Sequence, residues 1–150
     1  MHLLKVPGIN EMKIKQVVVL AMTAGLVAAC AVVPKGNFVT APSTPAPEGK
    51  AGVWLSSQES AIGDAVYNLY LTPNGQYAVC GDSLGETIQG SSGKLTMNNG
   101  KLSTIHSSGY ISEVSFIGNT MAIKDFMTFS KADHPTANCY KFFKDRGMIE

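Results

Sequence analysis

The chain has 150 residues, of which 45% are hydrophobic, and this length suits one small folded domain. Its 12 Lys and Arg residues nearly balance 11 Asp and Glu residues, so the formal net charge is +1. A nucleic-acid-binding protein needs a clustered basic face. The sequence has no such cluster, and we therefore expect no nucleic-acid partner.

The first segment has the pattern of an export signal. Lys13 and Lys15 precede an almost unbroken apolar run over residues 17–29, as in a secretory signal peptide. The run is shorter than the about 20 apolar residues that a membrane-spanning helix needs. We expect residues 1–29 to be a signal peptide. Met12 stands directly before the basic residues and is an alternative start to Met1.

This segment closes with Val27-Ala28-Ala29-Cys30, which resembles the lipobox of bacterial lipoproteins. The resemblance implies cleavage before Cys30 and diacylglyceryl and N-acyl modification of that cysteine. Several acyl chains on one residue give stable membrane anchoring. Ala31 stands where, in enteric members of that group, an aspartate favours retention in the inner membrane. The resemblance thus implies a lipid-anchored protein of the cell envelope, with the outer membrane favoured.

A proline-rich stretch follows the cysteine. Residues 31–50 contain Pro34, Pro42, Pro45 and Pro47, and such a composition favours extended conformations without a core. We expect residues 30–50 to be a lipidated spacer that holds the domain away from the bilayer.

Residues 51–150 have the pattern of an all-β domain. Short stretches of alternating apolar and polar residues predict strands, and Pro73-Asn74-Gly75, Asn99-Gly100 and Gly118-Asn119 predict tight turns between them. The expected strands cover residues 52–56, 65–72, 76–81, 94–97, 101–105, 110–117, 120–125, 126–130 and 139–143. Residues 126–130 either continue the preceding strand or form another. About seven or eight such strands suit an up-and-down antiparallel barrel or a compact β-sandwich.

Two further local features are expected in this domain. A short helix over Ser57–Ile62 would start at a serine cap and end at Gly63. If Cys30 carries lipid, Cys80 and Cys139 are an even pair in an exported chain, and a disulfide between them is the expected state. A metal or redox site would need a CxxC motif or further ligands nearby, and the sequence shows neither.

The sequence contains no familiar catalytic motif. It has no GxSxG, Walker or GxGxxG pattern, and His106 and His134 form no HxH or HxxxH pair. A pair of carboxylates that meets only in space remains open. We expect no catalytic residue, no metal and no cofactor, and hence a non-enzymatic envelope protein whose domain binds a partner or has a structural role.

Two family resemblances suggest more specific functions. Gly52-Val53-Trp54 resembles the GxW motif of lipocalins, which implies that Trp54 closes one end of a barrel, with Arg146 packed on it, and that the barrel carries a small apolar ligand. Ser107-Ser108-Gly109-Tyr110 resembles the loop of membrane-bound lysozyme inhibitors but departs from its spacing. The broadest similarity is to small bacterial outer-membrane lipoproteins with one β-rich domain.

Overall fold

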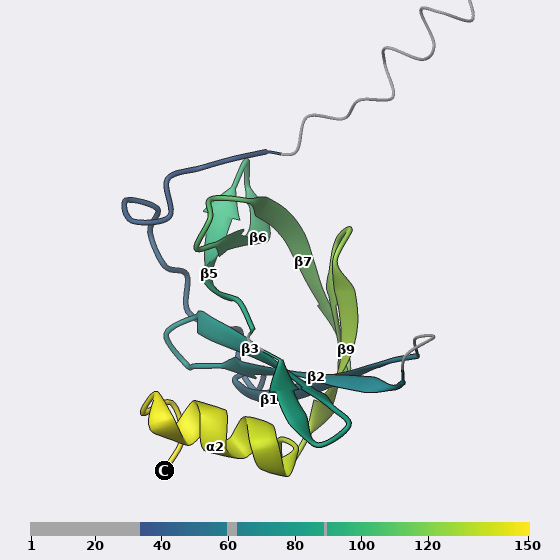
Figure 1. The fold of residues 1–150 in the computed structure, drawn as a ribbon. Helices are drawn as coiled ribbons and strands as arrows, with labels where there is room; N and C mark the ends of the chain where they lie inside the picture. The colour runs from purple at the N-terminus through teal and green to yellow at the C-terminus, as the bar shows by residue number, and fades with distance from the viewer. Residues whose placement is uncertain (1–33, 60–62, 89) are drawn as a thin grey trace, which may run out of the picture. The chain divides into compact units, whose positions relative to one another are not determined.

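The computed structural model describes residues 34–59, 63–88 and 90–150. Within them, nine strands form one antiparallel sheet, followed by a helix near the C-terminus (Figure 1). The elements are β1 (Gly52–Gln58), β2 (Ala65–Leu71), β3 (Gln76–Ser83), β4 (Glu86–Ile88), β5 (Ser92–Asn98), β6 (Lys101–His106), β7 (Ile111–Ile117), β8 (Thr120–Ile123), β9 (Met127–Ala132) and α2 (Ala137–Asp145). Residues 1–33, with the expected signal peptide and Cys30, lie outside the described residues.

Eight of the strands close into a barrel. β2 pairs with both β1 and β3, and β9 returns to β1, so the order around the wall is β1, β2, β3, β5, β6, β7, β8 and β9. β4 extends the sheet beside the end of β3. The expected all-β fold is confirmed, and of the two predicted architectures the barrel is the one observed. Among the described residues, no helix is long and apolar enough to cross a membrane.

The predicted tight turns occur and set the strand register. After β2, the Thr72 N–H donates to the Gln76 carbonyl at 2.8 Å and closes the turn into β3. Gly75 adopts a φ of +87° in this turn, a conformation that glycine reaches without steric cost. Asn99 and Gly100 both have positive φ, as a two-residue turn between antiparallel strands requires.

Large apolar side chains form a core inside the barrel. Every second residue of a strand points inward, and the inward residues are mostly large and apolar. The buried cluster consists of Trp54, Leu69, Leu71, Tyr77, Val79, Leu95, Val114, Met121, Ile123 and Phe129. Trp54 and Phe129 are fully buried. The Trp54 and Phe116 rings pack with centroids 5.6 Å apart.

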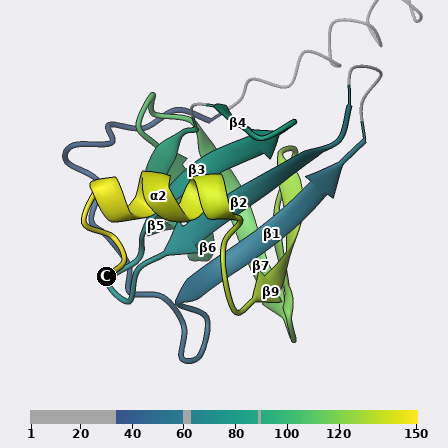
Figure 2. The same ribbon diagram turned by 60° about the horizontal axis from the view of Figure 1, so that its bottom comes forward.

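A second, smaller core lies outside the barrel under α2. Cys139 and Phe143 are one helical turn apart and bury the same face of the helix against Ala78 and Cys80 of β3. Figure 2 shows α2 lying across the outer face of the barrel wall. Cys80 and Cys139 form a disulfide with their Cα atoms 5.7 Å apart. The bridge thus joins β3 to α2.

The prediction of a last strand over residues 139–143 is therefore wrong. The sequence Cys-Tyr-Lys-Phe-Phe alternates weakly, but its two most buried residues have helical spacing. Thr136 caps the helix in an extended conformation, and Gly147 follows its end with a φ of +66°. Asn68 of β2 accepts the Thr136 N–H at 2.8 Å and so fixes the start of the helix on the barrel.

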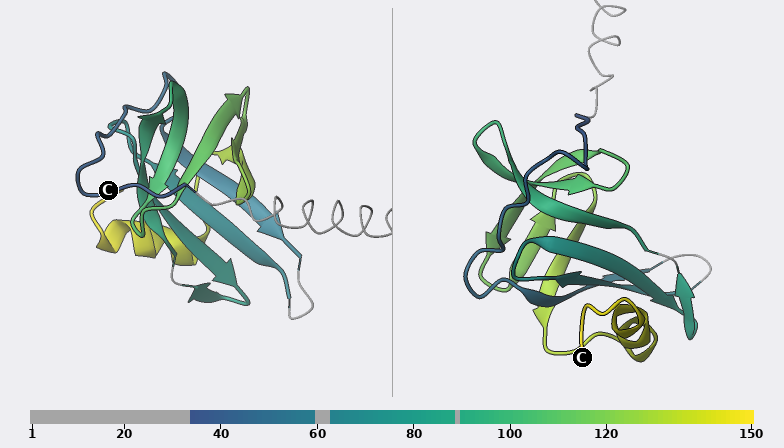
Figure 3. Two further views of the ribbon diagram at one scale, coloured as in Figure 1. Left: turned by 90° about the horizontal axis from the view of Figure 1, so that it is seen from above. Right: turned by 90° about the vertical axis from the view of Figure 1, so that its left-hand side faces the viewer.

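The described part of the expected spacer, residues 34–50, lies against the barrel rather than away from it (Figure 3). The Thr44 N–H bonds to the Leu95 carbonyl at 2.8 Å, and the Ala46 N–H bonds to the Pro73 carbonyl at 3.1 Å. Pro34–Glu150 form one compact unit. The prolines predicted a free spacer. The residues between them keep backbone N–H groups, and those of Thr44 and Ala46 bond to the barrel surface.

One smaller expectation needs correction. The helix expected from Ser57 to Ile62 is absent at its start, because β1 continues through Gln58; residues 60–62 lie outside the described residues. Of the two alternatives for residues 126–130, the separate strand is observed: Asp125 has a positive φ in the turn after β8, and β9 begins at Met127, after Phe126. The short strand β4 was not expected from the sequence.

Candidate functional site

A tryptophan of β1 packs against a lysine of β9. Trp54 Nε1 donates to the Lys50 carbonyl at 3.0 Å. Lys131, which faces Trp54 across the β1–β9 pairing, places its Nζ 5.0 Å from the centre of the Trp54 ring and donates to the Ala51 carbonyl. Burial lowers the pKa of the Lys131 ammonium, and the nearby charge of Lys50 lowers it further.

Arg146 is not the cation that packs on Trp54. It lies outside the barrel, with its guanidinium carbon 3.5 Å from the centre of the Phe142 ring. It lines an outer groove of about 900 Å³ that also includes Phe38 and Met148. The cation beside the Trp54 ring is Lys131. Sequence reasoning missed Lys131 because its inward direction depends on the register between the first and last strands.

The barrel wall has a seam where β1 and β9 separate. Their pairing covers Val53–Ala132, Trp54–Lys131 and Leu55–Ser130 and then stops. β1 continues for three more residues to Gln58, and β9 extends three residues before Ser130, to Met127. These two strand ends have no pairing with each other in the described sheet. Each therefore presents a free backbone edge toward the other.

An open cleft of about 750 Å³ occupies this seam. Its apolar lining comes from Leu55, Ile123, Phe126 and Met127, and its polar lining comes from Ser56, Ser57, Gln58, Asp125, Thr128 and Ser130. Phe126 is 54% exposed and adds an aromatic ring to the lining. Free backbone edges, hydroxyl groups and an exposed aromatic ring together suit the binding of an extended peptide segment.

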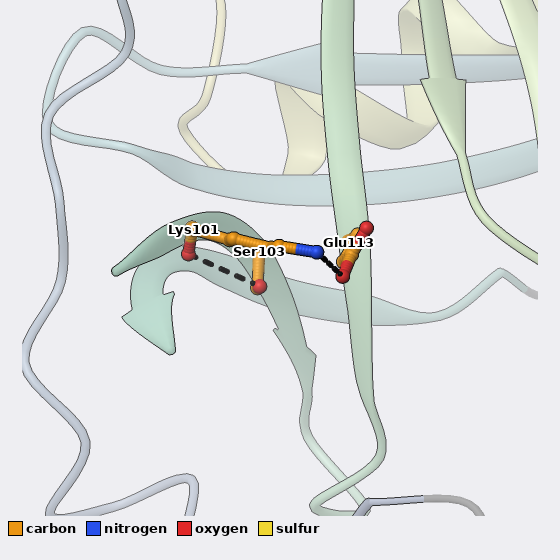
Figure 4. Close-up of polar contacts among 3 residues, drawn as sticks. All are labelled: Lys101, Ser103 and Glu113. Carbon is orange, nitrogen blue, oxygen red and sulfur yellow. Dashed lines mark hydrogen bonds and ion pairs between the residues drawn. The ribbon is translucent and has the colours of Figure 1, made fainter. Parts of the chain in front are cut away.

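The strands on one side of the seam form a distinct unit. β7, β8 and β9, here called the β7–β9 ribbon (Ile111–Ala132), pair with one another along most of their length. At the far margin the ribbon meets β6 over only three residue pairs, Ser103–Glu113 to Ile105–Ile111. Lys101 and Glu113 form an ion pair across this margin at 2.8 Å (Figure 4). The ribbon thus joins the rest of the wall by a short pairing on each side.

The segment that resembles the lysozyme-inhibitor loop is a tight turn between β6 and β7. The Gly109 N–H bonds to the His106 carbonyl at 2.7 Å, and the His106 N–H bonds to the Tyr110 carbonyl at 2.8 Å. The His106 Nδ1 atom lies 2.5 Å from the Ser108 hydroxyl oxygen. His134 is exposed and lies far along the chain, before α2. Across the described residues, no group of His, Cys, Asp and Glu side chains is arranged to hold a metal.

The closed eight-strand antiparallel barrel and its apolar core define a small lipocalin-like barrel. Residues 35–143 match the model of the family described as bacterial lipocalin LPS transport optimiser YedD. Because this match covers most of the chain, the protein belongs to that family of bacterial lipocalin-like lipoproteins.

The structure is also similar to a solved one. The crystal structure of a lipoprotein YedD from Klebsiella pneumoniae has 28% sequence identity and a TM-score of 0.61, and the match covers 77% of this chain and 99% of that one. A comparison with curated proteins found no match.

Proposed function

We propose that this protein is a lipid-anchored accessory protein of the outer membrane that promotes lipopolysaccharide transport by binding a protein partner in the β1–β9 cleft. The family description supports the process, and the unpaired ends of β1 and β9 support the mode of binding. The protein contributes recognition and no chemical step. Its anchor is lipid on Cys30, and its Cys80–Cys139 disulfide forms after export, in an oxidising compartment.

The interior packing favours this function over carriage of a small apolar ligand. Barrels that hold a ligand keep a cavity inside the wall, whereas Trp54, Phe129 and their neighbours occupy the interior of this one. The segment over residues 107–110 favours it over lysozyme inhibition, because it departs from the spacing of the inhibitor loop and forms a tight hydrogen-bonded turn. Lysozyme activity measured with and without the full protein tests that alternative, and we expect no inhibition.

A crosslink that closes the seam tests the proposed binding site. Continuing the β1–β9 register by two residues places Ser57 opposite Thr128, and both side chains are exposed. The double variant Ser57→Cys with Thr128→Cys, joined by a short thiol-reactive crosslinker, should therefore block the cleft. We expect cells that carry only this variant to deliver less lipopolysaccharide to their surface than cells with the native protein.

The matched control joins two strands that already pair. Ser115 of β7 lies opposite Ala122 of β8, so Ser115→Cys with Ala122→Cys adds the same chemistry without closing the cleft. This control should leave delivery of lipopolysaccharide unchanged. If the closed-seam variant forms its crosslink and still supports full delivery, the cleft is not the binding site.

The anchor has its own test. Mass spectrometry of the protein from membranes should show an N-terminal Cys30 that carries diacylglycerol and an acyl chain. A Cys30→Ser variant should stay in the unprocessed form or leave the membrane fraction. An unmodified Cys30 with the leader still attached would overturn the proposed location together with the argument for an oxidised cysteine pair.

A further inference from the structure

We propose that the end of the barrel formed by the β6–β7 turn rests on the phospholipid headgroups of the membrane that holds the lipid anchor. This inference depends on the proposed lipidation of Cys30 and adds a defined orientation to it. It follows from where the N-terminal segment first meets the barrel, from the short chain before that point, and from the charge of the surface around it.

Residues 34–36 are fixed against the β6–β7 turn. The Gly36 N–H donates to the Gly109 carbonyl at 2.8 Å, and the Ile111 N–H donates to the Pro34 carbonyl at 3.0 Å. Lys35 forms a β-bridge with Tyr110 between these two bonds. A Cβ atom on Gly109 would stand 2.6 Å from the Gly36 carbonyl oxygen, so the two segments approach as closely as a glycine allows.

The chain between the anchor and this contact is short. Only residues 31–33 separate Cys30 from Pro34, and a fully extended chain covers at most about 3.6 Å per residue. Pro34 therefore lies within about 14 Å of the lipidated residue. A spacer free to residue 50 would reach about 70 Å and would select no face of the barrel. The docked segment selects the β6–β7 end.

The opposite end of the same strands cannot reach the membrane in this orientation. β7 spans seven residues, Ile111–Ile117, which corresponds to about 23 Å at the usual rise per residue. The β7–β8 turn with Asn119 is at that far end. A headgroup layer is about 5 to 8 Å thick on each side of a bilayer, so one end of β7 touches it and the other does not.

The surface near the β6–β7 turn has the charge that suits anionic headgroups. Lys35 lies in the segment that meets this turn, and Lys94 follows Gly93, which pairs with His106 at the same end. Neither lysine has an acidic partner in the described residues, and they lie over the aromatic rings of Tyr110 and Phe38 at 4.5 and 4.8 Å. Phosphate groups of anionic lipids attract lysines at such a surface.

The exposed aromatic residue at this end has the matching chemistry. The Tyr110 side chain is 45% exposed, and tyrosine is enriched at the boundary between lipid and water because it has an apolar ring and a polar tip. Lysine likewise buries its alkyl stem and keeps its charge in the polar layer. The pair Lys35–Tyr110 is therefore suited to the headgroup region. The short chain between Cys30 and Pro34 holds this pair close to the anchor, so phospholipid headgroups are the nearest surface that the pair can contact.

Fluorescence quenching in vesicles tests this orientation. The full chain, processed in cells and purified from membranes, would carry one added cysteine labelled with a fluorophore, at Ser107→Cys beside the β6–β7 turn or at Asn119→Cys at the far end. Both positions are exposed. Each protein is reconstituted in vesicles of phosphatidylethanolamine and phosphatidylglycerol that contain a lipid with a quencher on its headgroup. We expect loss of most of the emission at position 107 and little loss at position 119.

Two results would overturn the proposal in different ways. Proteins that float with the vesicles but show equal quenching at both positions are anchored without the proposed orientation. Proteins that do not float lack the anchor, so both the orientation and the proposed location fail. A third measurement tests the charges: Lys35→Gln with Lys94→Gln should reduce quenching at position 107, whereas Lys141→Gln on α2 should not. Equal quenching in the two variants would show that Lys35 and Lys94 do not contribute to the contact with the headgroups.

Discussion

The two sides of the barrel wall are held together to very different extents. β1 and β2 pair along their whole lengths, and β2 pairs with β3 over seven residues. The Cys80–Cys139 disulfide fixes α2 on this side. The β7–β9 ribbon meets its neighbours over three residue pairs at each margin. The first region, β1–β3 with α2, is here called the clamped region.

This contrast indicates how a barrel with an apolar core can still bind a partner. The clamped region provides a fixed frame, and the ribbon provides an edge that is free where the β1–β9 pairing ends. Local opening draws on the regions with the fewest pairings and the most exposed backbone. A partner segment that enters the seam would then displace little native structure.

The largest expected effect comes from removal of the bridge in the clamped region. Cys80 and Cys139 are 59 residues apart, and a cross-link that closes a loop of this size stabilises a protein by about 4 kcal/mol in the chain-entropy model. The variant Cys80→Ala with Cys139→Ala should lose free energy of unfolding of that order in urea denaturation. A loss below about 1 kcal/mol would show that the packing of Phe143 and the hydrogen bonds of Thr136 and Asn138 hold α2 without the bridge.

The next effect concerns the interior that the clamped region shares with β5 and β6. Burial raises the pKa of the Tyr77 hydroxyl to about 12, against the opposing effect of its hydrogen bond with Thr104. A group whose pKa is higher in the folded state contributes stability below its unfolded pKa and loses it as the pH rises toward the folded value. Between about pH 10 and pH 12 this tyrosine should cost about 3 kcal/mol of stability.

Urea denaturation over this alkaline range tests the Tyr77 prediction. Tyr77→Phe should lack most of the pH dependence, since the phenylalanine ring has no proton to lose. Tyr140→Phe, on the exposed side of α2, provides the matched control and should keep the pH dependence of the native protein. Identical curves for Tyr77→Phe and the native protein would contradict the assignment.

A smaller effect is expected where the helix begins. Asn68 is fully buried; its side-chain oxygen accepts the Thr136 N–H at 2.8 Å and its nitrogen donates to the Thr136 hydroxyl at 3.1 Å. Asn68→Ala leaves the Thr136 N–H without this acceptor, which costs about 2 kcal/mol for a buried donor. Relative to the native protein, the variant should show a larger increase in hydrogen exchange at the start of α2 than at β8. Exchange that rises equally in both places would mean that the variant destabilises the barrel as a whole.

The sequence predicts the barrel well because its signals are local. Alternation identifies most strands, and Pro73-Asn74-Gly75 and Asn99-Gly100 form the expected turns. The helix at Ala137–Asp145 has local signals too, in Thr136 and Gly147. The short alternating pattern around Cys139 indicates a strand instead, whereas the four-residue spacing of Cys139 and Phe143 agrees with the helix.

The candidate site could not be predicted in the same way. The cleft exists because the pairing of β1 and β9 stops at Leu55 and Ser130, and this register joins residues far apart in the chain. The position of Lys131 over Trp54 depends on the same register. The docking of residues 34–50 combines backbone bonds with scattered side-chain contacts to residues far along the chain, and neither follows a periodic pattern in the sequence. The sequence therefore indicated the class of fold but neither the seam nor the course of the N-terminal segment.

The smallest expected effect concerns the other margin of the ribbon, where Lys101 and Glu113 pair. The pairing lowers the pKa of the Glu113 carboxyl and raises that of the Lys101 ammonium. The ion pair therefore contributes stability at pH values above the pKa of the glutamate in the unfolded chain, and this stability is lost as the pH falls through the lower pKa of Glu113 in the folded protein. At high pH it is lost again when Lys101 deprotonates. Because both groups are exposed and screened by salt, Glu113→Gln should lower the unfolding midpoint only slightly.

The charge-swapped variant tests whether this ion pair stabilises the pairing of β6 with β7. Lys101→Glu alone places two carboxylates together and should increase hydrogen exchange at Ile111–Glu113, where β7 meets β6. Adding Glu113→Lys restores opposite charges and should restore slow exchange. The same swap at Lys141 and Asp145 on α2, an exposed pair with a 2.7 Å contact, should leave the ribbon unchanged. If both swaps alter exchange at β7 alike, the weak margins do not behave as separate parts of the wall, and the contrast with the clamped region fails.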